Sequence, residues 1–501
     1  TGREATRKSG RPYFKAAVFC VIAGLAAKTM PADWEKSRDS AKTYPWSERM
    51  QLVLDTAKPL DYPRGGRLPL YLWPAMDPGD LSAADAERLV MESERRGVGI
   101  VCSWTPGERE ACLKRSLAIA RAQKKLGTPV NIDATRLLYS FFDGDIRTAH
   151  VDASGNAFFD ESFGKGHKMG CPFTLDLKKD GIRERVEWYV SAYKKEGIDV
   201  DFIWADWEID GPIEFNRAHE ASKKCVRCRE KIPGIDNFLA FQKSLRDIRS
   251  DLQRYCYASP VLEAFPRALV GNYAVYPHDG YRYWYDYFEE YEEGQPFIAE
   301  QNAKYRLWHN DFPGTGYTFA MPVVYPWARL FGWYDFDIPD YRWFYNMLRV
   351  ASNAAKNTPA CVPIISFVHW HMIDAEKYKA SAPVPFSEKM YRELLWHMLL
   401  RGTDAFYMWC GAAEYADEVR ILHEVWAAAQ KYGEFLDKGV PVAFDAPKRP
   451  GTVVSALRLG NRVLVRRTDF AGGKDAVTLN VGGKTMDIPP IPETCRVYVV
   501  R

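Results

Sequence analysis

Two acidic residues, Asp206 and Glu208, stand two positions apart near the end of the apolar stretch 200–211. Side chains two residues apart in an extended strand point to the same face. Carboxyl groups beside Trp204 and Trp207 are costly to bury without a purpose, so both are candidates for proton transfer or nucleophilic attack. A structural ion pair between Asp206 and Arg136 is the alternative interpretation.

A third carboxyl group, Glu263, follows the β-rich segment 255–261 and stands between apolar neighbours. Hydrolysis of a glycosidic bond uses two carboxyl groups, of which one protonates the leaving oxygen and the other attacks the sugar or activates water. Asp206 is the first candidate, and Glu263 and Glu208 compete for the second role. Glu263 can equally be an exposed loop residue. A separation of about 5 to 5.5 Å between the two carboxyl groups would indicate retention, and about 6.5 to 9.5 Å inversion.

Aromatic and polar residues at the predicted strand ends are expected to bind the substrate, because the C–H faces of sugars pack on rings and their hydroxyls find polar groups. These residues are Trp73, Trp104, Asp133, Arg136, Trp204, Trp207, Tyr325, Trp327, His369, Trp370, His371 and Trp409. His369 and His371 share a strand face, but no clear third metal ligand accompanies them, so hydrogen bonding is the preferred interpretation.

The segment 271–287 carries aromatic residues at too many offsets for a simple core stripe. Tyr273 and Tyr276 are expected to form part of a substrate wall, although packing of a helix explains many of these aromatics equally well. The polar members are His278 and Arg282. An arginine can bind the sulfate or carboxylate of an anionic glycan with two parallel hydrogen bonds.

The order of the elements indicates how these residues are brought together. Short β-rich segments alternate with amphipathic helices, a pattern typical of a parallel sheet covered by helices. The predicted strands are 68–73, 99–103, 129–133, 202–208, 255–261, 317–324, 362–369 and 405–409, and the predicted helices include 83–96, 109–126 and 182–196, each followed by glycine. Eight such units predict an α/β fold of the (β/α)8 TIM-barrel class, whose active site lies at the carboxyl ends of the strands.

The predicted domains are a catalytic barrel with an N-terminal extension (28–438) and a small, sandwich-like all-β domain (440–501), joined by a linker over 438–450. Within residues 1–27, a basic stretch precedes the apolar run 16–27, which predicts an export signal and a secreted or periplasmic protein; a buried strand is the alternative. No other apolar run approaches the length of a membrane span.

Composition narrows the class of partner. The 501 residues carry a formal charge of +3 and no basic run, which argues against nucleic-acid binding, while 16 Trp and 28 Tyr supply aromatic surface for sugars. No phosphate loop or dinucleotide motif is present, so no cofactor is expected. Cys225 and Cys228 form a C-x-x-C motif with only His219 as a neighbouring third ligand, so a disulfide or free thiols are preferred and no metal is predicted. We expect a monomer that acts on a polysaccharide, without a membrane partner.

The segment 204–208 resembles the fourth strand of retaining α-glycosidases, whose nucleophile is an aspartate at that position. Together with the segment ending in Glu263 and the aromatic run 271–287, the chain most resembles bacterial endo-α-L-fucanases that act on sulfated fucan. This resemblance implies Asp206 as nucleophile, Glu263 as acid/base, retention of configuration and internal cleavage. It suggests His278, Arg282 and Arg136 as sulfate contacts.

Two other functions stay open. The Asp-x-Glu pair at the end of the fourth strand also resembles the substrate-assisted hexosaminidases, in which Glu208 would be the acid and Asp206 would steady the N-acetyl group of the substrate. A glycan-binding barrel that has lost catalysis is the third interpretation, and it would keep the aromatic cleft.

Overall fold

The computed structural model describes residues 44–73, 78–139, 143–161, 166, 168–208, 216–278, 312–326, 336–372, 384–410, 413–491 and 493–500. The predicted export signal (1–27) and the predicted contacts Arg282 and Trp327 lie outside these residues. Among the described helices, none is long and apolar enough to cross a membrane.

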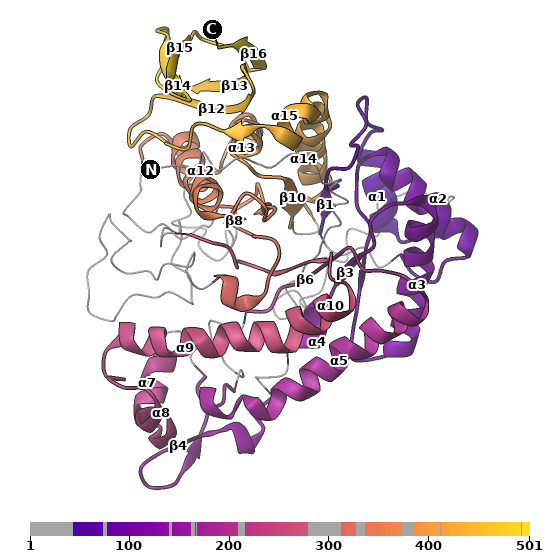
Figure 1. Cartoon of the computed structure of the whole chain (residues 1–501), viewed down its shortest axis with the longest axis vertical. Coiled ribbons are helices and arrows are strands. Elements are labelled where there is room, and N and C mark those ends of the chain that lie inside the picture. Colours follow the sequence, from indigo (N-terminus) through magenta and orange to yellow (C-terminus); the bar gives the residue numbers. More distant parts are fainter. Residues whose placement is uncertain are drawn as a thin grey trace.

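Eight short parallel strands form the centre of the described fold (Figure 1). They are β1 (Tyr71–Leu72), β2 (Val101–Ser103), β3 (Asn131–Asp133), β6 (Phe202–Ala205), β7 (Leu269–Asn272), β8 (Val323–Val324), β9 (Ile365–Val368) and β10 (Ala405–Met408). One sheet has the order β2-β3-β6-β7 and the other the order β1-β10-β9-β8.

The two sheets adjoin at both edges. Leu70 and Val98 form a parallel bridge next to β1 and β2, and the Thr318 backbone N–H donates to the Val270 carbonyl at 2.8 Å between β7 and the chain entering β8. A sheet that closes on itself leaves no free edge. The arrangement is consistent with the predicted barrel, and all eight carboxyl ends face the same way.

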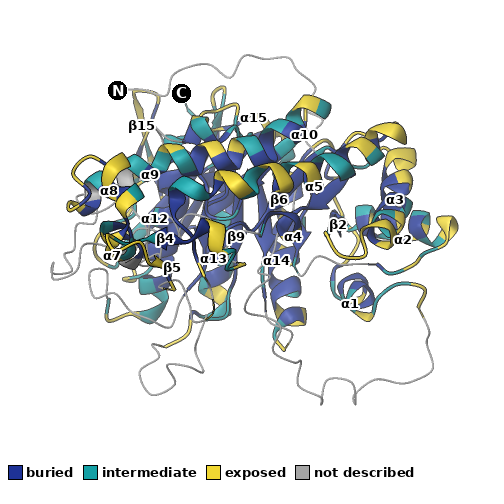
Figure 2. Cartoon of the chain, turned by 90° about the horizontal axis from the view of Figure 1, so that it is seen from below, coloured by how far each residue is buried: buried dark blue, intermediate teal, exposed yellow. Residues whose placement is uncertain are grey.

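Most of the described helices lie around the sheets, with buried residues on the side towards the strands and exposed residues outside (Figure 2). The described α-helices are α1 (Glu48–Thr56), α2 (Ala83–Arg95), α3 (Arg109–Leu126), α4 (Thr135–Leu138), α5 (Asp176–Lys195), α7 (Asn216–Lys224), α8 (Val226–Lys231), α9 (Phe238–Gln253), α10 (Ser259–Ala264), α12 (Pro339–Asn357), α13 (Glu388–Leu400), α14 (Tyr415–Ala429) and α15 (Gly433–Lys438). Gly127 ends α3 with φ of 66°, the left-handed cap that the sequence predicts.

The predicted fifth strand, 255–261, is wrong. Arg254–Ala258 is a turn of π-helix (η4) that continues α9, and α10 follows it directly. The fifth strand is instead β7, where Gly271 is required because a Cβ atom there would lie 2.3 Å from the ring of Phe319. Close approach to the ring requires glycine at this position, and glycine has low β propensity, so the sequence of β7 does not look like that of a strand.

The chain after α15 forms an antiparallel region, as predicted. Its four-stranded sheet has the order β11-β12-β13-β16, and β14 pairs with β15 in a hairpin. The bounds are β11 (Val440–Pro441), β12 (Thr452–Leu459), β13 (Arg462–Asp469), β14 (Val477–Val481), β15 (Lys484–Ile488) and β16 (Cys495–Val499). Sheet and hairpin share a small core that includes Val463, Val465 and Leu479. A further antiparallel pair, β4 (His150–Val151) and β5 (Ala157–Phe158), lies in the long segment between β3 and α5.

Candidate functional site

Three carboxyl groups lie at the carboxyl ends of β3 and β6. Asp133 is the last residue of β3, and its register partner on β6 is Trp204, so Asp206 and Glu208 follow just beyond the same edge. Asp133 and Asp206 are buried, whereas Glu208 is only half-buried. Of the three, Glu208 is therefore the carboxyl group with the best access to a molecule in the mouth of the barrel.

Side chains from the neighbouring elements hold the backbone that carries this pair. The N–H of Asp206 donates to Thr135 Oγ1 at 2.8 Å, that of Trp207 to Asn272 Oδ1 at 2.8 Å, and that of Glu208 to the Tyr139 hydroxyl at 3.1 Å. Asn272 also donates to the Trp207 carbonyl at 2.9 Å. The backbone groups of residues 206–208 thus have hydrogen-bond partners where the chain leaves the sheet, and the backbone that carries both carboxylates is held in place.

Neither carboxylate oxygen of Asp206 has a hydrogen-bond partner among the described residues, although the side chain is only 1% exposed. Burial raises the pKa of Asp206 well above its usual value, and the nearby carboxylates Glu208 and Asp133 raise it further. The alternative reading of Asp206 as a structural partner of Arg136 finds no support, because no ion pair joins them in the described part of the chain. A buried carboxyl group without partners is a strong sign of a functional role.

Burial also raises the pKa of Asp133, to about 7, against the opposing effect of hydrogen bonds from the Thr135 N–H (2.8 Å) and the Ser103 hydroxyl (3.0 Å). Like charges that lie close together resist simultaneous ionisation. Asp133 and Asp206 therefore hold protons at a pH at which isolated carboxylates are charged.

An aromatic wall continues from these carboxyl groups around the strand ends. The hydroxyls of Tyr273 and Tyr325 are 2.7 Å apart, and the Tyr325 ring lies 5.9 Å from that of Trp409. Trp409 in turn lies 6.1 Å from Trp73 and 5.0 Å from His369, measured between ring centroids. Residues that follow β1, β8, β9 and β10 are thus brought together as the sequence predicts, and they are joined by Tyr273, which follows the unpredicted strand β7.

His369 and His371 share one partner, which sequence reasoning missed. Glu418 of α14 lies 2.9 Å from Nδ1 of His369 and 2.8 Å from Nδ1 of His371 through the same oxygen, and it accepts the backbone N–H groups of Trp370 and His371. Burial acts to raise the pKa of Glu418, but the two histidines and these N–H groups lower it to about 2. His369 and His371 are therefore held by a buried carboxylate.

Several predicted residues do not line the cleft. Trp104 is fully buried and stacks on Tyr189 of α5, with 5.0 Å between centroids, and the Trp370 indole donates to the Phe386 carbonyl. Both rings pack away from the strand ends because adjacent side chains of a strand point to opposite faces. Trp207, Tyr276 and His278 are buried as well, and the buried Trp204 ring supports the aromatic wall from behind, 6.5 Å from that of Tyr273. Arg136 is exposed on α4.

Glu263 is the principal correction. It lies on α10, its side chain is 63% exposed, and Arg183 of α5 donates to its Oε2 at 2.9 Å. Because the segment before it is helical, Glu263 sits on the helical layer outside the sheet and cannot act together with Asp206.

Two cavities of the described part of the chain lie elsewhere. One of about 390 Å³ is bounded by α13, α14 and the C-terminal antiparallel region, and one of about 440 Å³ lies between α2 and α3. Neither is lined by the carboxyl groups or by the aromatic wall, so neither competes with the strand ends as a catalytic centre.

No protein-family model matches the chain, and no curated protein does. Solved structures with a similar arrangement include alpha-L-fucosidase isoenzyme 1 from Paenibacillus thiaminolyticus, 14% identical, covering 79% of this chain and 72% of that chain with a TM-score of 0.32. A noncanonic maltogenic alpha-amylase AmyB from Thermotoga neapolitana is 12% identical, covering 91% and 89% with a TM-score of 0.38. A cyclomaltodextrinase is 9% identical, covering 89% and 69% with a TM-score of 0.36. All three are glycoside hydrolases, but these values are too low to carry a functional argument, which rests on the site itself.

Proposed function

We propose that this protein is a glycoside hydrolase in which Glu208 is the general acid and Asp206 is its buried partner. The observation that carries the proposal is the burial of Asp206 without a hydrogen-bond partner, two residues before a half-buried glutamate. Two such carboxyl groups share protons, and the more accessible one can pass a proton to a leaving oxygen. The aromatic wall supplies flat surface on which a sugar ring can pack.

This assignment favours the substrate-assisted mechanism. A carboxylate that is 1% exposed is poorly placed to attack an anomeric carbon, but it can turn towards a polar substituent of a sugar held beside Glu208. In that mechanism the N-acetyl group of the substrate replaces the enzyme nucleophile. The proposed substrate class is therefore a glycan with N-acetylated sugars.

The second candidate is the endo-α-L-fucanase acting on sulfated fucan with retention of configuration. The position of Asp206 just beyond β6, the fourth of the parallel strands in chain order, favours it as a nucleophile. In this version Glu208 must replace Glu263 as the acid/base. A glycan-binding barrel without catalysis is the remaining outcome.

The test is the release of reducing ends by wild type and three variants on N-acetylated glycans, sulfated fucans, agarans and carrageenans. We expect Glu208→Gln and Asp206→Asn to lose at least about a hundredfold in kcat, the usual effect of removing an acid/base group. Glu263→Gln, which removes a surface ion pair, should keep wild-type activity.

The substrate panel separates the candidates. Turnover confined to N-acetylated glycans supports the substrate-assisted mechanism, and turnover confined to fucan supports the fucanase. Loss of activity in Glu263→Gln, with full activity in Glu208→Gln, would contradict the assignment of the acid. Binding without cleavage of any polymer would refute catalysis.

A further inference from the structure

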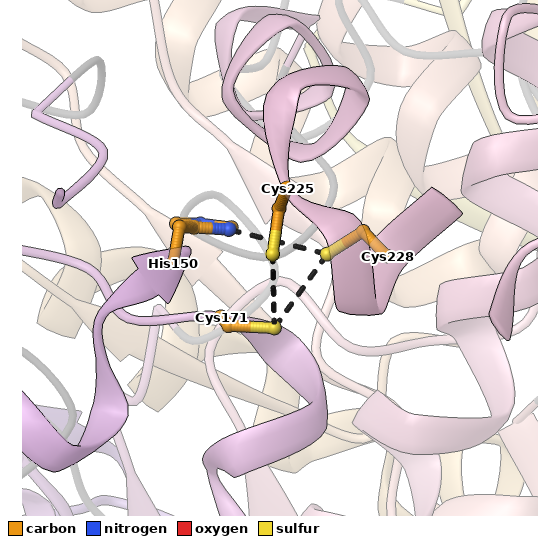
Figure 3. A group of neighbouring side chains, drawn as sticks. All are labelled: His150, Cys171, Cys225 and Cys228. Carbon is orange, nitrogen blue, oxygen red and sulfur yellow. Dashed lines mark hydrogen bonds between the residues drawn. The ribbon is translucent and has the colours of Figure 1, made fainter. Parts of the chain in front are cut away.

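Four potential metal ligands meet in one buried cluster outside the candidate active site. They are His150 at the start of β4, Cys171 just before the 3₁₀ turn η3 (Pro172–Thr174), and Cys225 and Cys228 at the beginning of α8 (Figure 3). All four side chains are at most 2% exposed. Three thiols and an imidazole are the ligand set of a structural zinc site.

The distances fit one tetrahedral ion. The sulfur of Cys171 lies 3.6 Å from that of Cys228 and 3.9 Å from that of Cys225, and Nδ1 of His150 lies 3.9 Å from the sulfur of Cys228. Zinc–sulfur bonds of about 2.3 Å at tetrahedral angles place sulfur atoms about 3.8 Å apart. A disulfide requires about 2.05 Å, and all three cysteines are free thiols.

The chain around the cluster is built to hold these four groups. His150 pairs with Phe158 in the β4–β5 ladder, and the two rings stack with centroids 5.1 Å apart. The Cys171 N–H donates to the Thr148 carbonyl at 2.7 Å, and a Cβ atom on Gly170 would lie 2.4 Å from that same oxygen. The short spacing between the two segments therefore depends on this glycine and brings His150 and Cys171 to the same end of the hairpin.

The surrounding charge also suits a metal-bound cluster. Three thiolates and one divalent cation leave a net charge of −1, which needs nearby positive charge when buried. Arg227 of α8 donates to the carbonyl of Ala149, the residue before His150, at 2.9 Å, whereas Lys223 and Arg229 form ion pairs with Glu220 and Asp236. Arg227 is therefore the basic residue whose contact brings positive charge next to the cluster.

We propose that His150, Cys171, Cys225 and Cys228 bind one Zn²⁺ as a structural site. Four protein ligands close the coordination shell, which leaves no position for a substrate or a reactive water. Soft thiolate ligands in a tetrahedral arrangement select zinc over magnesium or calcium. The expectation of no metal is thereby replaced, and His219, whose Nε2 contacts the Ile235 carbonyl, is not a ligand.

The site joins two segments that leave the catalytic strands. His150 and Cys171 belong to the segment between β3 and α5, and Cys225 and Cys228 belong to the segment between β6 and α9; β4 and α8 lie together in Figure 1. β3 ends in Asp133, and β6 precedes Asp206 and Glu208. The ion therefore cross-links the two long insertions that follow the carboxyl-bearing strands.

The first measurement is the metal content of the purified full-length chain, expressed with zinc and freed of loosely bound metal by gel filtration. We expect one zinc per chain by elemental analysis, and release of that zinc to a chromophoric chelator only after the thiols are blocked with a mercurial. Growth with cobalt should give the visible bands of tetrahedral Co²⁺ with thiolate charge transfer.

Cys225→Ser and Cys171→Ser should reduce the bound zinc at least tenfold, whereas Cys112→Ser, which changes a buried free thiol elsewhere, should keep it. If the ligand variants fail to fold, the zinc content and cobalt spectrum of the wild-type protein still test the site. Less than about a tenth of a zinc per chain, with no cobalt spectrum and no rise in melting temperature on adding zinc, would refute the site. None of these readouts depends on glycosidase activity.

Discussion

The carboxyl groups at the ends of β3 and β6 owe their properties to burial. Asp133, Asp206 and Glu208 lie close enough for the charges of Asp133 and Glu208 to raise the pKa of Asp206, and no described cation pairs with Asp206. Removing carboxylates from water without pairing them costs folding free energy. A cluster of buried carboxyl groups with raised pKa values at the mouth of a barrel is typical of a functional site.

Asp133 gives a prediction about stability and pH. Because its folded pKa of about 7 lies above the unfolded value, the folded state holds the proton more tightly, and stability falls as pH rises between about 4 and 7. The loss of stability from this one group approaches about 1.4 kcal/mol per pH unit within this range. Asp133→Asn removes the ionisation and should flatten this decline, which urea unfolding from pH 4 to 8 measures.

The matched control is Asp417→Asn, which changes an exposed aspartate on α14 and should keep the wild-type slope. Wild-type stability that rises steadily from pH 4 to 7, with the same profile in Asp133→Asn, would contradict a raised pKa at this position.

At the scale of elements, local patterns predicted most strands and helices but failed where packing overrides propensity. Seven of the eight parallel strands overlap the predicted segments, because apolar runs bounded by turns identify buried strands. The segment 255–261 looks β-rich, with two tyrosines and a valine, yet it extends the helical pattern of α9 and packs against α5. β7 was missed because Gly271 and Asn272, which suit close packing and polar clamping, are poor strand formers.

The candidate site was predictable to the same extent. Residues directly after a strand were found, since parallel strands bring their carboxyl ends together. Thr135, Tyr139 and Asn272 were not, because their role is to bind the backbone of another element, and no local pattern encodes that contact. Thr135 and Tyr139 do lie a few residues after the predicted strand end at 133, but Asn272 ends β7, a strand that the sequence did not predict.

Asn272 is the clearest positioning residue, and its replacement tests how far the clamp matters. Asn272→Ala leaves the Trp207 N–H and carbonyl without their buried partners, which should cost about 2 to 4 kcal/mol and displace Glu208. If the proposed function is right, kcat should fall at least about tenfold while KM changes little, and the dependence of kcat on pH should shift. Steady-state kinetics against pH on the substrate found in the panel measure both effects.

Asn131→Ala is the control, because Asn131 is a buried asparagine at the opposite end of β3 that donates to the Ile100 carbonyl at 2.8 Å. It should lose stability and keep the wild-type pH profile. Equal pH profiles and kcat values for the two variants would show that Asn272 supports the fold alone.

At the scale of the whole molecule, the features that could not be predicted from the sequence are contacts between residues far apart in the chain. His150 and Cys171 reach Cys225 and Cys228 across 54 to 78 residues, and Glu418 reaches His371 across 47. The C-x-x-C motif was visible, but its two other ligands were not, because hairpin geometry and not spacing brings them close. The boundaries of the barrel and the β domain stay predictions, and the contacts between these parts are extensive.

A buried polar network joins the C-terminal antiparallel region to α12 and α13. Arg401, which is fully buried, donates to the hydroxyls of Ser455 and Ser352 at 2.7 Å and to the carbonyls of Phe444 and Asp445 at 2.6 and 2.8 Å. Arg466 of β13 forms a buried ion pair with Glu393 of α13. Such contacts require both parts to be folded, so the two parts should unfold together.

Arg401→Met tests this coupling. The substitution keeps an apolar side chain of considerable length but leaves several buried acceptors unpaired, which should cost about 3 to 5 kcal/mol. In scanning calorimetry the wild type should show one transition, and the variant should melt earlier, with a separate transition for the C-terminal region or faster proteolysis within 440–450. Arg95→Met, which removes an arginine that is 63% exposed and forms a surface ion pair with Glu92, should change stability by no more than about 0.5 kcal/mol. Two well-separated transitions already in the wild type, unchanged by Arg401→Met, would mean that the antiparallel region folds independently and that the buried network does not couple it to the barrel.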